Sequence, residues 1–215
     1  MIRTFILDFD GTMADTQSVI VHVMQLTLQE RGAAPRTPAQ CAATIGLPLT
    51  QCFEVLLNLT TPEAQLYADT YRRIFDEERK PGVVKTFPHV IETIKALHDK
   101  GCYVTIATSR GRESLQNFLN DFQLNDYIAY TVCVGETEQA KPHPAPVLKT
   151  LEHLYEQPEN ALVVGDTIFD IAMGQGASCL TCGVTYGNQT RAQLEAQHPT
   201  YLIDDFAELL KLTSK

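Results

Sequence analysis

The sequence predicts an α/β fold, a doubly wound, Rossmann-like parallel sheet with an inserted all-helical cap domain. Three observations support this prediction. Short apolar runs alternate with helical patterns over most of the 215 residues. The runs lack polar alternation, which is typical of strands that helices cover on both faces. One continuous stretch, residues 15–81, contains helical patterns but no convincing strand.

Six segments have the composition of strands, and helical patterns fall between them. The strands are expected at residues 5–7, 103–107, 130–134, 161–164, 179–184 and, with a weaker pattern, 200–203. Helices are expected from Pro88, at a first helical position, to Gly101, around the apolar face of Leu115, Phe118, Leu119 and Phe122, and at residues 146–154 and 168–174. Strand and helix in alternation favour a parallel sheet.

The stretch without strands leaves this pattern just after the first strand and rejoins it before the second. Residues 37–40 form a capping box with a proline in the first turn, and Thr61 begins a further helical pattern. We therefore expect an α/β core domain of residues 1–14 and 82–215 and a helical cap domain of residues 15–81.

Composition narrows the classes of partner. The formal net charge is -9 and the pI is about 5.1, so broad binding to nucleic acid or to an anionic membrane is not expected. No run approaches the roughly 18 apolar residues of a membrane span, and the apolar run at the start stops at Asp8. We expect a cytoplasmic monomer whose six scattered cysteines are reduced and mostly buried.

The strongest chemical signal is the segment Asp8-Phe9-Asp10-Gly11-Thr12, which follows the first strand directly. In a parallel sheet, ligands bind at the carboxyl ends of the strands. Alternation along the chain would place Asp8 and Asp10 on one side. A divalent cation would relieve the repulsion between them, and magnesium prefers such hard oxygen ligands. Gly11 permits a tight turn and a close approach of the backbone. Taken alone, the segment also fits a turn with two solvated aspartates.

A second acidic pair follows the strand at residues 161–164. Asp166 and Asp170 are four residues apart, so both carboxylates can point the same way across one helical turn. Asp166 is the candidate metal ligand, and Asp170 is expected to bind the metal through water or to hold a neighbouring group. Taken alone, Asp170 also fits an ordinary cap or a surface acid.

Two further segments carry groups that suit an anion. Thr108 and Ser109 follow the second strand, where hydroxyl and amide groups before a helix form an anion site or a simple cap. Lys141 lies in the proline-rich segment 141–144 and offers a compact positive charge. Taken alone, this signal is weak, because a lone lysine in a loop is usually solvent-facing.

The four segments together, in this order, resemble the haloacid dehalogenase-like (HAD) superfamily. The helical insert after the first segment is similar to the cap of the subclass that includes phosphoglycolate phosphatase, pyrophosphatases and β-phosphoglucomutase. The resemblance implies that Asp8 is the nucleophile and forms a phospho-aspartate. It implies that Asp10 is the general acid and base, with its carbonyl at the metal, and that Thr108 and Lys141 bind the transferred phosphoryl group. Metal ligation by Asp8, Asp10, Asp166 and Asp170, and substrate contacts by Gly11 and Ser109, are implied in the same way.

The function predicted by the resemblance is a Mg²⁺-dependent phosphatase acting on a small phosphorylated metabolite. The alternatives are a phosphomutase and a pyrophosphatase. Mutases of this kind carry a His at the position of Ile20, and His22 would point about 200° away around the helix. Halide removal disagrees with the presence of Asp10, and a non-catalytic binding module disagrees with an intact set of catalytic residues. The same resemblance suggests that residues 45–49 cover the site and that Arg110 reaches the substrate.

Overall fold

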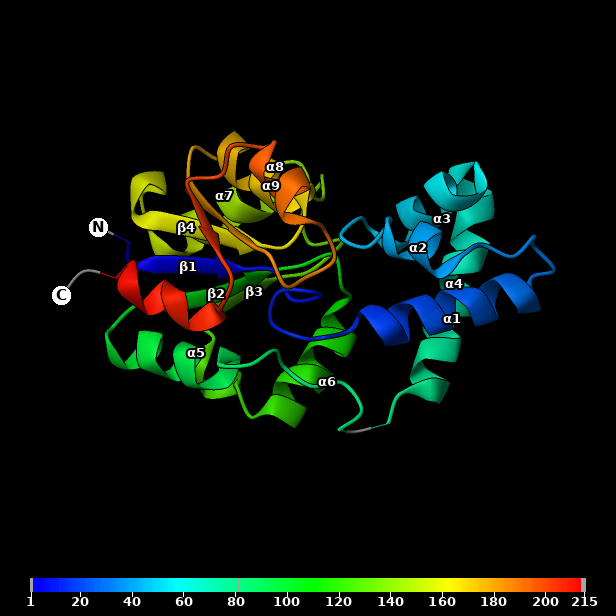
Figure 1. Ribbon diagram of the computed structural model, residues 1–215, viewed down its shortest axis with the longest axis horizontal. Helices are drawn as coiled ribbons and strands as arrows, with labels where there is room; N and C mark the ends of the chain where they lie inside the picture. The colour runs from blue at the N-terminus through cyan, green and yellow to red at the C-terminus, as the bar shows by residue number, and fades with distance from the viewer. Residues whose placement is uncertain (1, 81, 214–215) are drawn as a thin grey trace.

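The computed structural model describes residues 2–80 and 82–213. Pro81, the predicted last residue of the cap, and residues 1, 214 and 215, at the predicted ends of the core, lie outside these ranges. The predicted domain limits remain predictions, while the fold class is confirmed. Figure 1 shows a parallel sheet between two helical layers, with helices α1 to α4 set apart beyond one end of the strands.

The sheet has six strands, all parallel, in the order β3-β2-β1-β4-β5-β6. This is the order of a doubly wound dinucleotide-binding fold. The strands are β1 (Thr4–Leu7), β2 (Tyr103–Ala107), β3 (Tyr130–Val132), β4 (Ala161–Gly165), β5 (Leu180–Val184) and β6 (Tyr201–Ile203). Because β1 lies between β2 and β4, the residues that follow these three strands meet at the centre of one sheet edge.

Helices cover both faces of the sheet, as the uninterrupted apolar runs predict. The core helices are α5 (Val90–Asp99), α6 (Arg112–Phe122), η1 (Asn125–Tyr127), α7 (Ala145–Leu154), η2 (Pro158–Asn160), α8 (Ile168–Gly176), α9 (Arg191–Glu195) and η3 (Phe206–Lys211). Ile6 packs with Val147 and Met173 on the face covered by α7 and α8. Its neighbours Phe5 and Leu7 face the larger apolar cluster on the opposite side, where α5, α6 and η3 lie.

The inserted segment is helical, as predicted. It comprises α1 (Gln17–Glu30), α2 (Pro38–Ala42), α3 (Leu49–Leu57) and α4 (Thr61–Glu78). The predicted capping box forms at α2, where the amide of Gln40 donates to the Thr37 hydroxyl at 3.2 Å. The larger apolar cluster continues from the sheet into these helices, through buried side chains such as Phe53 and Phe75.

Several predicted element limits differ from the structure by one or two residues, as at α8, which continues to Gly176; two of the differences have a clear local cause. Helix α5 begins at Val90, not at Pro88, because His89 takes a left-handed conformation with φ 63° that separates the proline from the helix. Strand β3 ends at Val132, two residues early, because the amide of Glu136 donates to the carbonyl of Cys133 and closes a turn.

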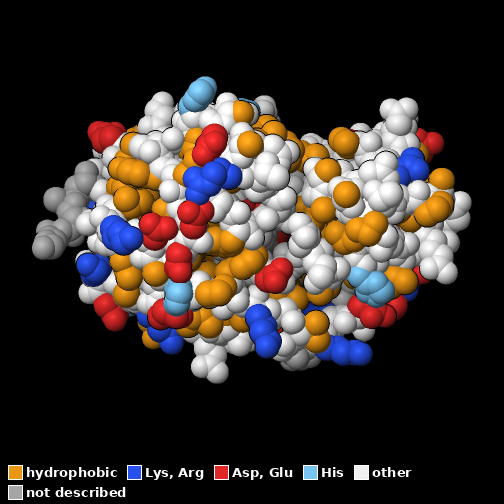
Figure 2. Space-filling model, viewed as in Figure 1, with side chains coloured by type: hydrophobic (Ala, Val, Ile, Leu, Met, Phe, Trp, Pro, Cys, Tyr) orange, Lys and Arg blue, Asp and Glu red, His pale blue; other side chains and the backbone are white. Residues whose placement is uncertain are grey.

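The cysteines, the helices and the surface charge agree with the composition. All six cysteines lie within the described ranges and are free thiols, and five of them are buried. Within the described ranges, every helix is too short or too polar to cross a bilayer. On the face shown in Figure 2, acidic and basic side chains are interspersed, and the outline narrows between the part that holds the sheet and the part formed by α1 to α4.

Candidate active site

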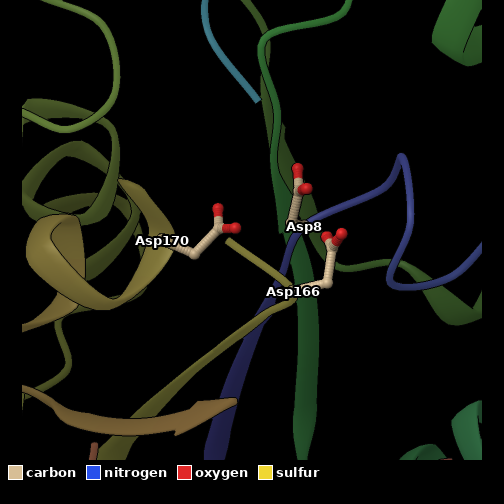
Figure 3. Close-up of side chains that lie close together, drawn as sticks. All are labelled: Asp8, Asp166 and Asp170. Atoms are coloured by element: carbon tan, nitrogen blue, oxygen red, sulfur yellow. The ribbon is translucent and has the colours of Figure 1, made fainter. Parts of the chain in front are cut away.

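Three buried carboxylates converge at the carboxyl end of the sheet (Figure 3). Asp8 follows β1, Asp166 follows β4, and Asp170 lies in the first turn of α8. Their nearest ligand oxygens all lie within 4.8 Å of one another. The backbone fixes this arrangement, because the amide of Asp8 donates to the carbonyl of Val164 at 2.8 Å and so continues the pairing of β1 with β4.

Lys141 connects two of the three carboxylates. Its Nζ atom lies 2.5 Å from Oδ1 of Asp8 and 2.6 Å from Oδ1 of Asp170, and the lysine is only 3% exposed. Burial opposes its positive charge, but Asp170 and Asp8 outweigh burial and raise the pKa of Lys141. Lys141 is therefore a permanent cation, and the four groups together carry an excess of negative charge.

Burial, together with this excess of negative charge, raises the pKa of two of the carboxylates. Burial raises the pKa of Asp8 well above its usual value; Lys141 opposes the rise, and Asp170 and Asp166 add to it. Burial and the charge of Asp170 raise the pKa of Asp166 to about 7, although hydrogen bonds from Asn188 and Thr12 oppose the rise. A cation placed among these oxygens would remove the cause of the repulsion.

Asp166 is oriented by Thr12, from the segment after β1, and by Asn188, which the sequence did not single out. Thr12 Oγ1 donates to Oδ1 of Asp166 at 2.9 Å, and the amide and side chain of Asn188 both donate to Oδ2 at 2.7 Å. Gly11 makes this packing possible: its φ is +87°, and a Cβ there would stand 2.2 Å from Oδ2 of Asp166. The requirement for glycine in the first motif is therefore steric as well as conformational.

Asp10 does not join the carboxylate cluster through its side chain. Its carboxylate accepts bonds from Arg110 Nη2 at 2.5 Å, Arg110 Nε at 3.1 Å and Thr16 Oγ1 at 2.8 Å. Its carbonyl oxygen is turned toward Asn188, whose Nδ2 lies 3.5 Å away. The carbonyl, rather than the carboxylate, therefore lies on the side of Asp166.

Thr108 and Ser109 follow β2 and lie beside this cluster. Thr108 is buried, and its hydroxyl accepts a bond from the amide of Arg110 at 3.1 Å, as in a simple cap. Ser109 Oγ donates to the carbonyl of Gly46 at 2.7 Å. The loop between α2 and α3 thus reaches the site.

A cavity of about 370 Å³ opens between the sheet edge and the inserted helices. Asp8, Asp10, Thr108 and Arg110 contribute polar groups to one side. Apolar side chains from the inserted segment form much of the other, namely Ile20, Met24, Ile45, Leu47, Pro48, Leu49, Tyr71 and Phe75. The cavity therefore combines a charged end, where the carboxylates lie, with a small and largely apolar enclosure.

The raised pKa of Asp166 has a consequence for stability. Below pH 7 the folded protein holds a proton that the unfolded chain releases near pH 3.8, so the free energy of unfolding should fall as pH rises between these values. One such group contributes a slope of about 1.4 kcal/mol per pH unit. Urea unfolding in EDTA from pH 5 to pH 8 should show the decline, and Asp166→Asn should reduce it. If the slope is unchanged in Asp166→Asn, Asp166 is not the group whose raised pKa causes the decline.

The sequence matches the haloacid dehalogenase-like hydrolase family over residues 5–184. Pyrophosphatase PpaX of Anoxybacillus flavithermus is 31% identical over 211 residues, which cover 98% of this chain and 96% of that protein. Pyrophosphatase PpaX of Bacillus mycoides is 30% identical and covers 100% of this chain and 98% of its own length. These similarities extend over the sheet and the inserted helices alike.

Solved structures show the same fold. A haloacid dehalogenase-like hydrolase from Bacteroides fragilis superimposes with a TM-score of 0.91 at 23% identity, covering 97% of this chain and 100% of that one. A predicted phosphoglycolate phosphatase from Haemophilus somnus gives a TM-score of 0.89 at 22% identity. The match covers 99% of this chain and 98% of that one. At these identities the structures establish a shared architecture, with the inserted helices included.

Proposed function

Because the chain belongs to the haloacid dehalogenase-like hydrolase family, we propose that it is a Mg²⁺-dependent phosphatase acting on a small phosphorylated metabolite. One observation carries this proposal: buried Lys141 binds Asp8 and Asp170, and the oxygens of both lie beside Asp166. A nucleophilic carboxylate, a fixed cation and a further carboxylate in one enclosed site are the groups that phosphoryl transfer requires.

The residues of the site fit a magnesium ion. Asp8 and Asp166 are the proposed carboxylate ligands, and the carbonyl of Asp10 is a third oxygen on the same side. Hard oxygen donors of this kind suit Mg²⁺. Asp170 binds Lys141 through Oδ1 and Thr167 through Oδ2, and its proposed contribution is to hold Lys141 or a bound water. When bound, the ion would neutralise charge on Asp8 and on the phosphoryl oxygens.

The proposed reaction has two displacements. A carboxylate oxygen of Asp8 attacks phosphorus and forms an acyl phosphate, while the bond to the leaving oxygen breaks and Asp10 supplies the proton. Water then attacks the same phosphorus, and the bond to Asp8 breaks. Asp10 takes the proton from that water, so the enzyme returns to its starting state and inorganic phosphate is released.

The remaining groups bind and neutralise the transferred phosphoryl group. Lys141 lies against Asp8, so its charge would offset the repulsion between the carboxylate and an anionic substrate. Thr108 lines the cavity beside Asp8 and offers a hydroxyl there. Closure of the loop at Gly46 over Ser109 would exclude bulk water from the reaction.

Two observations bear on the alternatives. Pyrophosphate is the alternative substrate, because two relatives that match nearly the whole chain are named pyrophosphatases. A phosphomutase is disfavoured because, among the described residues that line the cavity, none is a histidine, and Ile20 occupies the wall. We propose that the predicted cap, residues 15–81, is the part of the protein that selects the substrate.

The experiment that tests this function is phosphate release from a panel of pyrophosphate, phosphoglycolate, a hexose phosphate and a nucleoside monophosphate. We expect phosphate release in the presence of Mg²⁺. The release should be lost in EDTA and should return when Mg²⁺ is added in excess. Circular dichroism of the EDTA-treated protein is the control for folding. Release that EDTA does not affect would contradict the metal requirement, and release from no compound would contradict the phosphatase.

A further inference from the structure

Asp10 and Arg110 form a largely buried ion pair at the edge of the cavity. The side chain of Arg110 is 8% exposed and that of Asp10 is 15% exposed, and two guanidinium nitrogens contact the carboxylate. By contrast, Arg72 and Arg112 also border the cavity but are about half exposed and pair with Asp69 and Glu136. Arg110 is thus the buried guanidinium among these three arginines.

This ion pair is incompatible with the role proposed for Asp10. Both oxygens of the carboxylate are occupied, Oδ1 by Arg110 and Thr16 and Oδ2 by Arg110. A leaving oxygen that exchanges a proton with Asp10 must therefore displace at least one of these donors. Proton transfer through Asp10 therefore requires the pair to open during each turnover, and opening it leaves a largely buried guanidinium without its carboxylate partner, which is unfavourable.

The surroundings of Arg110 indicate which partner moves. Its guanidinium carbon lies 5.6, 5.1 and 4.9 Å from the ring centres of Phe9, Phe75 and Phe118. Its Nη1 atom also donates to Ser114 Oγ at 2.7 Å. These contacts hold the guanidinium in place, so rotation of the Asp10 side chain is the simpler movement. The vacated guanidinium nitrogens would then face the cavity.

We propose that Arg110 exchanges Asp10 for a second anionic group of the substrate, and that the enzyme therefore prefers substrates with such a group beside the transferred phosphoryl group. A diphosphate or a phosphorylated carboxylic acid meets this condition. An ester with a neutral remainder does not, because nothing replaces Asp10 at the guanidinium. This inference rests on the proposed phosphatase function and deepens it.

The test compares kcat/KM for pyrophosphate and phosphoglycolate with kcat/KM for glycerol 2-phosphate, whose remainder is neutral. In Arg110→Gln the preference for the two anionic substrates should fall about 10- to 100-fold, as expected for a lost charged hydrogen bond. Most of the change should be in KM. Arg110→Lys retains the charge and should keep part of the preference. Added guanidinium ion should restore Arg110→Gln on the anionic substrates alone.

Arg112→Gln is the matched control, because it removes the same charge two residues away at the exposed rim. Its preference should equal that of wild type, and thermal unfolding checks that each variant is folded. The inference is wrong if Arg110→Gln and Arg110→Lys slow all three substrates equally, or if Arg112→Gln lowers the preference as much. If wild type prefers glycerol 2-phosphate to the two anionic substrates, the inference is wrong but the proposed phosphatase function still stands. If wild type hydrolyses none of these or the panel compounds, the proposed function itself fails.

Discussion

Asp8→Asn is expected to lower kcat/KM for phosphate release on the order of 10⁴- to 10⁶-fold, the scale measured when a covalent nucleophile is removed. An amide oxygen is a poor nucleophile, so the acyl phosphate should not form. The measurement is phosphate release with Mg²⁺ on the best substrate of the panel. Mass spectrometry after rapid acid quenching should detect a phosphorylated peptide containing residue 8 in wild type but not in the variant.

The loss in Asp8→Asn should not come from unfolding. Asparagine removes a buried negative charge whose proton affinity is raised by burial, so the variant in EDTA at pH 8 should unfold at the same temperature as wild type or higher. Asp15→Asn is the matched control, because Asp15 is exposed and lies seven residues further along. Residual activity above one per cent in Asp8→Asn, or equal loss in both variants, would rule out Asp8 as the nucleophile.

Lys141→Met should be nearly inactive and also unstable. The change leaves the buried carboxylates of Asp8 and Asp170 without their shared cation. Loss of one partner of a buried ion pair costs about 3–5 kcal/mol of stability, and loss of the charge at the phosphoryl group should lower kcat on the order of 10²- to 10³-fold. Urea unfolding in EDTA and steady-state kinetics measure the two effects separately.

The stability loss of Lys141→Met should depend on pH. The pKa of Asp8 is already raised in wild type and should rise further without Lys141, so at pH 5 the carboxyl can take a proton and the penalty shrinks. The penalty should be larger at pH 8, where less of the carboxyl is protonated. Lys211→Met is the control, because its pair with Glu208 is exposed and should be worth less than about 1 kcal/mol. A loss equal at both pH values would contradict this account.

The fold could be predicted from the sequence because its central strands are buried on both faces. Such strands leave apolar runs, as at β1 and β4, and the turns between them leave Gly, Pro and capping residues. The errors came where local geometry overrides pattern. Nothing in the sequence indicates that His89 adopts a left-handed conformation, which moves the start of α5 beyond Pro88.

The position of the carboxylates could also be predicted, because Asp8 and Asp166 follow neighbouring strands of a parallel sheet. The partners of these carboxylates could not. Asn188 lies in an ordinary loop after β5, and its contact with Asp166 depends on how that loop folds back. The pairing of Asp10 with Arg110 joins residues 100 apart, and no spacing rule connects them. Side chains that orient catalytic groups are therefore harder to recognise in a sequence than catalytic groups that directly follow a strand.

The two sides of the cavity come from different stretches of the chain, and this separates two kinds of evolutionary change. The charged side is tied to the sheet, where a substitution disturbs Asp8, Lys141 or Asp166 directly. The apolar side comes from the inserted helices, where Met24 or Leu49 could change size without breaking any bond of the acidic cluster. A lineage could therefore acquire a new substrate by drift within one segment while the reaction itself stays constant.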